Sequence, residues 1–423
     1  MTFANPRVWF LSRSGSPRFG RRVSFAVVTY AFTVTMIGTT LPTPLYPIYS
    51  REFGFSELMV TVVFATYAVG VIAALLVFGR LSDEIGRRRV LLAGLALSGL
   101  SAVVFLVAQE IGLLLAGRIL SGLSAGIFTG TATAALADLA PRKAAGHATV
   151  VATLANIGGL GSGPLMAGLL AQLAVAPLRL TFWVDLALII PAVVLVWFLP
   201  EPVQTEGRVR LHLQRLRVPP QAREIFVRAG LAAFAGFAVL GLFTAVSPGF
   251  LSQVLGIANH AIVGLVVFAV FAASLAGQTM LVVVFRKRAL VVGCVGLIMG
   301  MCLLALGLAL PSLLLVILGA VVAGLGQGLS FRTGLAAVNR AAPPRQRAEV
   351  ASSFFVVAYV AISVPVVVCG VIAQLQGVQV AGLILAATVA VLAATVLLLL
   401  ARKPVPLGEE HREPTEARDS DDS

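Results

Sequence analysis

The stretch Gly-Arg-Leu-Ser-Asp-Glu-Ile-Gly-Arg-Arg-Arg at residues 79–89 is a short charged turn between two long apolar runs. These runs, 58–78 and 90–107, are each long enough to cross a bilayer, which takes roughly 20 residues. Basic residues alone can anchor a membrane turn, which needs neither a lone aspartate nor two spaced glycines. The turn therefore predicts a membrane protein, and its pattern indicates a more specific role than anchoring.

The composition is typical of a chain that lies mainly in a membrane. Hydrophobic residues make up 59% of the 423 residues and charged residues 12%, about half the charged fraction of a soluble domain. The formal net charge is +13, but the charges stand in short turns and not in a basic face with interleaved aromatics. We therefore exclude a large soluble domain and expect no nucleic-acid partner.

The cysteines and histidines show no pattern for a metal or another cofactor. The four histidines are far apart in sequence, and Cys294, Cys302 and Cys369 all lie inside apolar runs. Neither set has metal-ligand spacing, and a disulfide framework is not expected. We predict buried, unreactive thiols, no metal and no cofactor.

Twelve apolar runs can be counted, mostly of helix length and without the alternation of a barrel strand. Their approximate limits are 23–48, 58–78, 90–107, 112–138, 147–175, 181–199, 227–251, 261–285, 289–310, 312–340, 350–374 and 380–401. The prediction is an all-α membrane protein with twelve transmembrane helices. Three prolines at 42, 44 and 47 are expected to break the outer end of the first helix.

The distribution of Lys and Arg predicts the orientation. With the N-terminus inside, Arg51 and Arg179 fall outside and Arg118 and Arg332 fall within spans, which leaves 27 of the 31 basic residues on the cytoplasmic side. Such asymmetry predicts that both termini are cytoplasmic, and it supports an even number of spans.

The two halves of the chain are related to each other. A shift of 202 residues, without a gap, aligns three glycine-, proline- or glutamine-containing segments: Gly122–Gly126 with Gly324–Gly328, Pro141 with Pro343, and Gly168–Leu173 with Gly370–Leu375. Spans 4 and 5 therefore correspond to spans 10 and 11, which predicts six helices plus six in parallel repeat. We expect a substrate site near the midplane, between the halves.

The turn at 79–89 closely resembles the signature loop of the major facilitator superfamily of secondary transporters. The matching positions are Gly79, Asp83, Gly86, Arg87 and Arg88. The resemblance implies a loop on the cytoplasmic side between the second and third helices, in two six-helix bundles that alternate their access.

In that family the acid of the signature loop meets the N-terminal end of span 11. Here span 11 begins near Val350, so Asp83 is expected to act as a gate near residues 351–353. Asp138, at the inner end of span 4, is placed to pair with Arg87.

The predicted organisation has five segments. A basic cytoplasmic N-terminus covers 1–22, the first bundle 23–200, a cytoplasmic linker 201–226, the second bundle 227–401, and a disordered cytoplasmic tail 402–423. The linker is basic and contains two adjacent prolines. It is either a solvated connection that sets topology or a site for anionic lipid.

Charged groups inside the membrane region are costly, and each is a functional candidate. Arg118, followed by a glycine-rich face, resembles a second motif of the family that is associated with proton transfer, with Ser121 where Gln is usual. Asp185 in span 6 has a similar depth, and we predict that the two residues pair. The structural alternatives are an arginine bound to a carbonyl and an aspartate that caps its helix.

Arg332 in span 10 is the third such candidate, and it has no acidic partner in its own half. No Asp or Glu occurs between Glu224 and Glu349, and the basic turn at 286–288 has lost the aspartate of its counterpart. We expect Arg332 to face water or an anionic group, or to pack against carbonyls. A membrane carboxylate that carries protons must then come mainly from the first half, where Asp185, Asp138 and Asp83 are the candidates.

Span 5 resembles the antiporter motif of the drug-efflux branches. The matching residues are Gly159, Gly163, Pro164 and Gly168, while Ala167 replaces one glycine. Proline removes a backbone hydrogen bond and glycine allows close packing, which gives a kinked, compliant helix. A plain packing kink is the structural alternative.

These observations predict a secondary transporter in the plasma membrane, not an enzyme, that exports a small amphiphilic molecule by proton antiport and works as a monomer. The alternative function is proton-coupled import of a small metabolite. A membrane-embedded enzyme would need clustered His, Asp or Cys near one interface, and the sequence shows none.

Overall fold

The computed structural model describes residues 19–78, 81–141, 145–201, 214 and 216–402. Within these ranges, twelve helical segments are long and apolar enough to cross a membrane, which confirms the predicted all-α fold. Gly79 of the signature loop, half of the linker and nearly all of both terminal segments lie outside the described residues.

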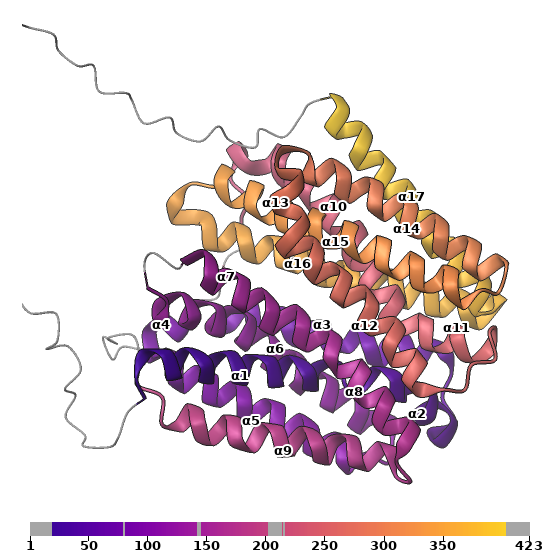
Figure 1. The fold of residues 1–423 in the computed structure, drawn as a ribbon, viewed down its shortest axis with the longest axis horizontal. Coiled ribbons are helices and arrows are strands. Elements are labelled where there is room, and N and C mark those ends of the chain that lie inside the picture. The colour runs from indigo at the N-terminus through magenta and orange to yellow at the C-terminus, as the bar shows by residue number, and fades with distance from the viewer. Residues whose placement is uncertain (1–18, 79–80, 142–144, 202–213, 215, 403–423) are drawn as a thin grey trace, which may run out of the picture.

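In its described residues, the first half contains six spans built from eight α-helices and two short 3₁₀ or π segments, and one short turn helix stands in the signature loop (Figure 1). Their bounds are α1 Arg21–Thr40, η1 Thr43–Leu45, α2 Tyr46–Phe53, α3 Glu57–Phe78, α4 Leu81–Ile85, α5 Arg87–Leu106, α6 Ile111–Leu139, α7 Ala145–Thr153, η3 Leu154–Gly158, α8 Gly159–Leu173 and α9 Pro177–Trp197. As predicted, the first span breaks at its proline-rich end, where α1 stops before η1 and α2.

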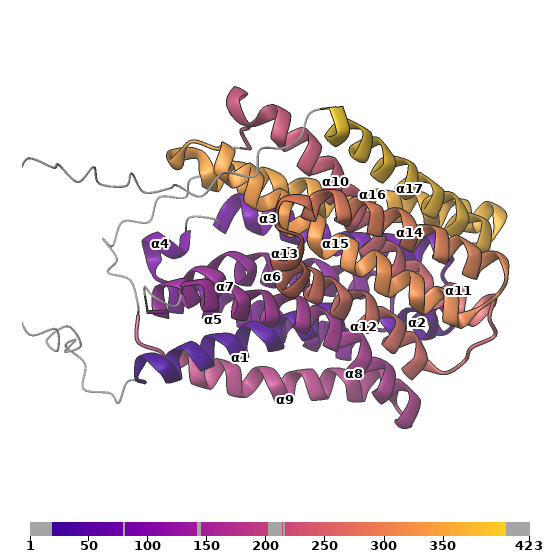
Figure 2. The same cartoon turned by 45° about the horizontal axis from the view of Figure 1, so that its top comes forward.

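The second half contains the other six spans. Their bounds are η4 Pro220–Ala222, α10 Arg223–Gly241, η5 Leu242–Val246, α11 Ser247–Gln253, α12 His260–Ala276, η6 Gly277–Leu281, α13 Val282–Phe285, η7 Arg286–Arg288, α14 Ala289–Ala309, α15 Leu313–Ala341, η8 Pro344–Gln346, α16 Arg347–Gln376 and α17 Val378–Arg402. Figure 2 shows this half, pink through orange to yellow, lying over the first.

The internal repeat is visible in the helix boundaries. Helix α14 begins 202 residues after α5, and α15 begins and ends 202 residues after α6. The gap-free shift in sequence therefore corresponds to helices of matching length and position, which supports a parallel repeat of six spans.

The alternation of the spans defines two sides of the bundle. The described ends, Arg21 and Arg402, lie on one side, which we call the termini side (Figure 1). The opposite or distal side carries the turns near residues 54–56, 107–110, 174–176, 254–259, 310–312 and 377. The charge asymmetry predicts that the distal side is the outer one.

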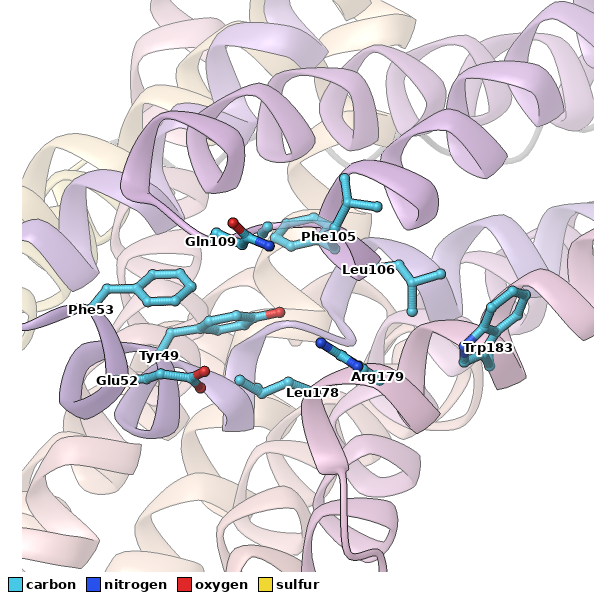
Figure 3. Close-up of a pocket in the computed structure, with 11 residues that line it drawn as sticks. Tyr49, Glu52, Phe53, Phe105, Leu106, Gln109, Leu178, Arg179 and Trp183 are labelled. Atoms are coloured by element: carbon cyan, nitrogen blue, oxygen red, sulfur yellow. The ribbon is translucent and has the colours of Figure 1, made fainter.

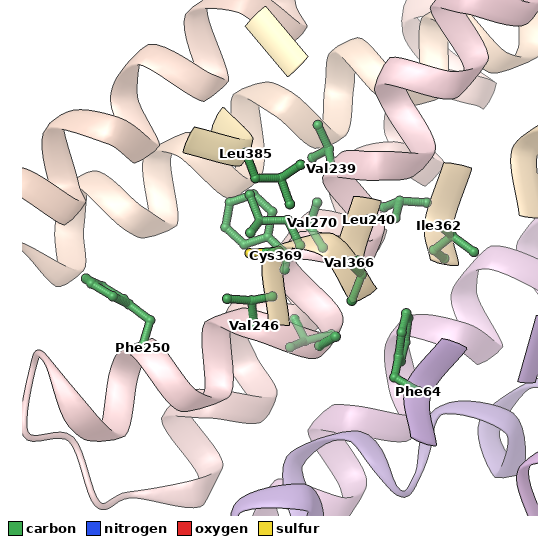
Figure 4. Close-up of a cluster of buried hydrophobic side chains, with 14 of the residues drawn as sticks. Phe64, Val239, Leu240, Val246, Phe250, Val270, Ile362, Val366, Cys369 and Leu385 are labelled. Atoms are coloured by element: carbon green, nitrogen blue, oxygen red, sulfur yellow. The ribbon is translucent and has the colours of Figure 1, made fainter. Parts of the chain in front are cut away.

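The two halves meet along α3 with α16 and along α8 with α12. Close backbone approach makes this possible: a Cβ at Gly168 would lie 3.2 Å from the Cα of Gly264, and one at Gly370 would overlap Thr61. The largest buried apolar cluster lies mainly in the second half and continues into the first through residues such as Phe64 (Figure 4).

Hydrogen bonds between the halves are found on the distal side. The Gln253 side-chain amide donates to Glu57 Oε1 at 2.5 Å, and the His260 backbone N–H donates to Gln172 Oε1 at 3.1 Å. With the close packing of Gly168 on Gly264 and of Gly370 on Thr61, these contacts close the distal side.

One prediction about the cysteines is wrong. Cys294 and Cys369 are buried, but Cys302 is exposed on the surface of α14. An apolar run does not by itself imply burial, because a membrane helix exposes one apolar face to lipid.

Candidate functional site

Arg87 is the centre of the signature turn on the termini side. Its guanidinium lies 2.5 Å from Asp83 Oδ1 and 3.1 Å from Asp138 Oδ2, and it donates to Ser82 Oγ at 2.5 Å. Arg87 is only 8% exposed, so these partners compensate a largely buried charge. The predicted Asp138–Arg87 pair is confirmed, and it ties the start of α5 to the end of α6.

Glu201, which follows span 6, completes this cluster and was not recognised from the sequence. Its carboxylate accepts hydrogen bonds from the backbone N–H groups of Arg87, at 2.7 Å, and Arg88, at 3.2 Å. The first amides of a helix lack acceptors within the helix, and an anion there is favourable. Glu201 therefore caps α5 and links span 6 to the signature turn.

Gly86 is required by both conformation and space. Its φ is 103°, a left-handed conformation that side chains disfavour, and a Cβ would lie 2.5 Å from Glu201 Oε2. The second glycine of the motif thus allows the Glu201 cap. Next to it, the Arg88 guanidinium lies over Trp197 at 5.6 Å from the ring centroid, which packs the turn onto α9.

Asp83 has an exposed side chain, and its ion pair with Arg87 lies within the turn itself. No hydrogen bond or ion pair joins it to residues 351–353 in the part of the chain that the structure describes. The gating prediction concerns a state that is closed on the termini side, whereas this structure is closed on the distal side. It therefore stays a prediction.

Arg118 is buried in the membrane interior with 1% exposure. Its Nη1 donates to the Thr39 carbonyl at 2.7 Å and its Nη2 to the Phe64 carbonyl at 3.4 Å. The guanidinium also lies 4.7 Å from the ring centroid of Tyr67. Carbonyl oxygens and aromatic faces, not a carboxylate, surround this cation.

The predicted ion pair between Arg118 and Asp185 is not formed in this structure. Asp185 is 2% exposed, and its Oδ1 has no hydrogen-bond partner among the described residues. Its carboxylate lies beside Gly38, where a Cβ would come within 2.8 Å of Oδ2. The two side chains contact successive residues of α1, Gly38 and Thr39, and the carbonyl of Thr39 takes the place that the carboxylate was expected to fill.

Arg332 lies on α15 and is partly buried. It forms no ion pair or hydrogen bond with any residue in the described ranges, in keeping with the lack of acids in this half. The expectation that it faces water or an anionic group remains a prediction.

The span 5 motif packs against α1. A Cβ at Gly159 would lie 2.6 Å from Met36 Cβ, and one at Gly163 would overlap the Thr40 hydroxyl and the Ile37 carbonyl. Gly168 lies further along, where α8 meets α12 of the other half. The glycines thus bring span 5 against both span 1 and span 8.

Pro164 interrupts the hydrogen bonds of α8, the helix that carries these glycines. It has no backbone N–H, so the carbonyl of Leu160, four residues earlier, loses its helical donor. The Thr40 hydroxyl donates to that carbonyl at 2.8 Å. One turn before, residues Leu154–Gly158 form a π-helix, and the predicted irregularity of span 5 is confirmed.

A row of aromatic rings crosses from one half to the other near the middle of the spans. Its centroid distances are 6.2 Å from Tyr67 to Tyr359, 6.5 Å from Tyr359 to Phe237, 5.1 Å from Phe237 to Phe331, and 5.8 Å from Phe331 to Phe355. We call these five residues the aromatic row. Phe237, Phe355 and Tyr359 are only partly buried, and Arg118 joins the row through Tyr67.

Sequence reasoning missed Glu201, Thr40 and the aromatic row. The proline of span 5 signalled an orphan carbonyl, but not the residue that would satisfy it. The aromatic residues lie on four helices of both halves, and only the packing brings them together.

A helical bundle of two repeated halves, with buried charges and an aromatic row between them, defines a secondary transporter. The family model of the Major Facilitator Superfamily matches residues 24–364 and 258–419. The chain belongs to this superfamily: it is a multi-pass membrane transporter and not an enzyme.

The fold is similar to that of a bacterial homologue of the human lysosomal transporter Spinster, in an inward-facing and unoccupied conformation. The TM-score is 0.72 at 16% identity, over 90% of this chain and 96% of that one. No curated protein matches the chain in sequence.

Proposed function

We propose that this transporter exports a small amphiphilic molecule, such as a drug or a secondary metabolite, by proton antiport with alternating access. The aromatic row is the observation that carries this proposal. It contains residues of both halves, so a molecule bound there would contact both sides of the moving interface. Its mainly apolar character, with Tyr67 and Tyr359 as its polar members, favours an amphiphilic substrate.

The antiporter-like motif of span 5 favours export, and the packing of this span supports alternating access. Its proline, its π-helix and its close contacts with α1 and α12 make it a helix whose bend is held by neighbours from both halves. A helix of this kind is suited to couple the movement of span 1 to that of span 8.

Asp185 is our candidate for the proton-carrying group. An ionised carboxylate inside a membrane is costly unless it is paired, and Asp185 has no cation paired with it among the described residues. Its contact with Gly38 places it against span 1, so a change in its charge would act directly on that helix. The buried Arg118 contacts the same turn of α1 and joins it to the aromatic row.

The expected setting follows from the charge asymmetry. We propose a plasma-membrane location with the termini side in the cytoplasm, and a monomer as the working unit. The closed distal side then corresponds to a state that opens toward the cytoplasm.

The test combines a susceptibility panel with transport in vesicles. Cells with and without the protein are compared across amphiphilic drugs and metabolites, and each hit is then measured in inverted membrane vesicles that carry an imposed pH gradient. Phe237→Ala is the test variant for the aromatic row. Phe285→Ala, at the end of α13 and outside the row, is its matched control.

We expect the protein to raise tolerance to at least one amphiphile, and Phe237→Ala to abolish that effect while Phe285→Ala retains it. Uptake into inverted vesicles should stop when the pH gradient is dissipated and should survive ATP depletion when the gradient is held. Sensitisation of the cells instead of protection would favour the importer alternative. Dependence on ATP alone would overturn the proton-driven mechanism.

A further inference from the structure

A cavity lies in the first half on the distal side, away from the aromatic row. Its volume is about 600 Å³, and it is formed by α2, the end of α5 with the following turn, and the start of α9. Figure 3 shows its lining side chains: Tyr49, Glu52, Phe53, Phe105, Leu106, Gln109, Leu178, Arg179 and Trp183. The signature loop, the membrane charges and span 5 all lie outside it.

The cavity carries one cation and one anion that do not pair with each other. Arg179 comes from α9 and Glu52 from α2, and both are exposed. Neither forms an ion pair or a side-chain hydrogen bond within the described part of the chain. Gln109 adds an exposed amide to the same wall. A ligand that carries both charges could satisfy both residues at once.

Tyr49 supplies an independent sign of a ligand. It is 1% exposed, and its hydroxyl has no hydrogen-bond partner among the described residues. In Figure 3 this hydroxyl points toward Arg179 and Phe105, which also line the cavity. A buried hydroxyl without a partner is unfavourable, so a ligand that forms a hydrogen bond with Tyr49 would be stabilised at this site.

The walls around Tyr49 are already packed. Phe105 stacks on Phe182 at 4.9 Å between centroids, and Tyr49 lies 5.5 Å from Phe53. These contacts fix the ring of Tyr49 and leave its hydroxyl at a defined position. The cavity is therefore formed before any ligand enters it.

The rim of the cavity carries exposed apolar side chains of the kind expected at the membrane–water interface. Trp183 on its rim is 58% exposed and stands near the distal end of α9. Val107 on the same rim is 54% exposed. An exposed tryptophan near a helix end is typical of the membrane–water interface. An amphiphile could place its head in the cavity and its chains along this rim.

We propose that this cavity binds the zwitterionic headgroup of a phospholipid from the distal leaflet. The phosphate lies at Arg179, with the Tyr49 hydroxyl and the Gln109 amide as further donors, and the ammonium lies at Glu52. Phe53, Leu106 and Trp183 contact the first carbons of the chains. A free phosphoethanolamine has the same headgroup chemistry without these chains. The site does not depend on the transported substrate.

The protein contains its own probes for this test. Trp183 lies at the cavity and Trp197 lies near the other end of the same helix, so each can be kept as the single tryptophan. The purified protein in detergent is titrated with phosphatidylethanolamine that carries brominated chains, and tryptophan quenching is measured. Brominated phosphatidylglycerol and brominated diacylglycerol test the headgroup, and free phosphoethanolamine tests competition.

We expect saturable quenching of Trp183 by phosphatidylethanolamine and only gradual, unsaturated quenching of Trp197. Arg179→Gln and Glu52→Gln should each weaken binding about tenfold, since each removes a charge-assisted contact. Arg179→Lys should retain part of the affinity. Arg288→Gln, an exposed cation on the termini side, is the control and should bind as the unchanged protein does.

Competition by phosphoethanolamine would show that the headgroup alone is recognised, and its absence with saturable quenching would show that the chains contribute. Both results support the proposal. Equal quenching by diacylglycerol would overturn it. Unchanged binding in both charge variants would also overturn it, provided that size-exclusion chromatography shows both to be folded monomers. Tighter binding of phosphatidylglycerol would assign the cavity to anionic lipids and would also overturn it.

Discussion

The hydroxyl of Thr40 on α1 donates a hydrogen bond of 2.8 Å to the carbonyl oxygen of Leu160 on α8. That carbonyl is the acceptor which Pro164 leaves without a helical donor. Gly163 allows the approach, because a side chain there would occupy the position of the hydroxyl. The proline-glycine motif of span 5 is thus completed by a residue of span 1.

Thr40→Val should destabilise the protein by about 0.6 kcal/mol, the average for hydrogen bonds between membrane helices, and by no more than about 1.7 kcal/mol. The change keeps the shape of the side chain and leaves the Leu160 carbonyl without its donor. Thermal unfolding in detergent measures the effect. Thr35→Val is the control, because the buried Thr35 hydroxyl donates to Ala31 within its own helix.

A double-mutant cycle makes the test specific. Pro164→Ala restores a backbone N–H to α8, which can donate to Leu160 once the helix straightens. The loss from Thr40→Val should therefore be smaller in the Pro164→Ala background. Additive losses would contradict the assigned role of Thr40.

Gly163→Ala should lower stability by about 1–3 kcal/mol, the usual cost of overpacking. The new methyl group would meet the Ile37 carbonyl and lie 3.2 Å from the Leu41 backbone nitrogen, and backbone atoms cannot rotate away. Gly130→Ala in α6 is the matched control, since nothing lies within 4 Å of its Cβ position. It should be neutral or stabilising by up to about 1 kcal/mol. Equal effects of the two changes in a melting assay would argue against close packing at Gly163.

Sequence patterns predicted much of the fold because membrane helices carry their signal in long apolar runs. The repeat follows from the 202-residue shift, the breaks in the first and fifth spans follow from their prolines, and the Asp138–Arg87 pair follows from the inner ends of spans 3 and 4. The predicted ion pair between Arg118 and Asp185, in contrast, is not formed in this structure. Equal depth along two helices says nothing about which faces meet, and the Thr39 carbonyl proved to be the partner of Arg118.

Glu201 and the aromatic row show the same limit. Glu201 lies more than 110 residues from the amides it caps, with separations of 114 and 113. No spacing in the chain indicates that contact. The cap became evident only with Gly86, whose left-handed backbone leaves room for the carboxylate.

Asp83→Asn should reduce transport severalfold while the amount of protein in the membrane stays the same. The exposed carboxylate contributes little to folding, whereas a gate contact to the start of α16 in the opposite state would be lost. Transport is measured in vesicles and the protein level by immunoblot. Asp138→Asn offers a comparison, because Asp138 joins two spans through Arg87 and its loss should also lower thermal stability. Normal transport in Asp83→Asn would remove the gating role.

Asp185→Asn should separate proton coupling from substrate binding. The variant cannot release a proton at this position, so transport driven by a pH gradient should be lost and its dependence on pH should become flat. Exchange of labelled for unlabelled substrate without a gradient should persist, since the aromatic row is unchanged. Both are measured in proteoliposomes. Loss of exchange together with driven transport, in a folded variant, would assign Asp185 to substrate binding or structure instead.

Glu57 and Gln253 should act as a latch on the distal side. Their hydrogen bond of 2.5 Å joins α3 of the first half to α11 of the second, and a carrier that alternates its access must break it to open this side. Cysteines placed at both positions, in a background that lacks Cys294, Cys302 and Cys369, should cross-link with a short reagent and stop transport. Reductant should restore it. The double-cysteine variant without the reagent is the control for loss of the hydrogen bond. It should still transport, although its distal side is less firmly closed. If transport continued after complete cross-linking, the distal side would not need to open at this contact, and the alternating movement would have to take place elsewhere in the interface.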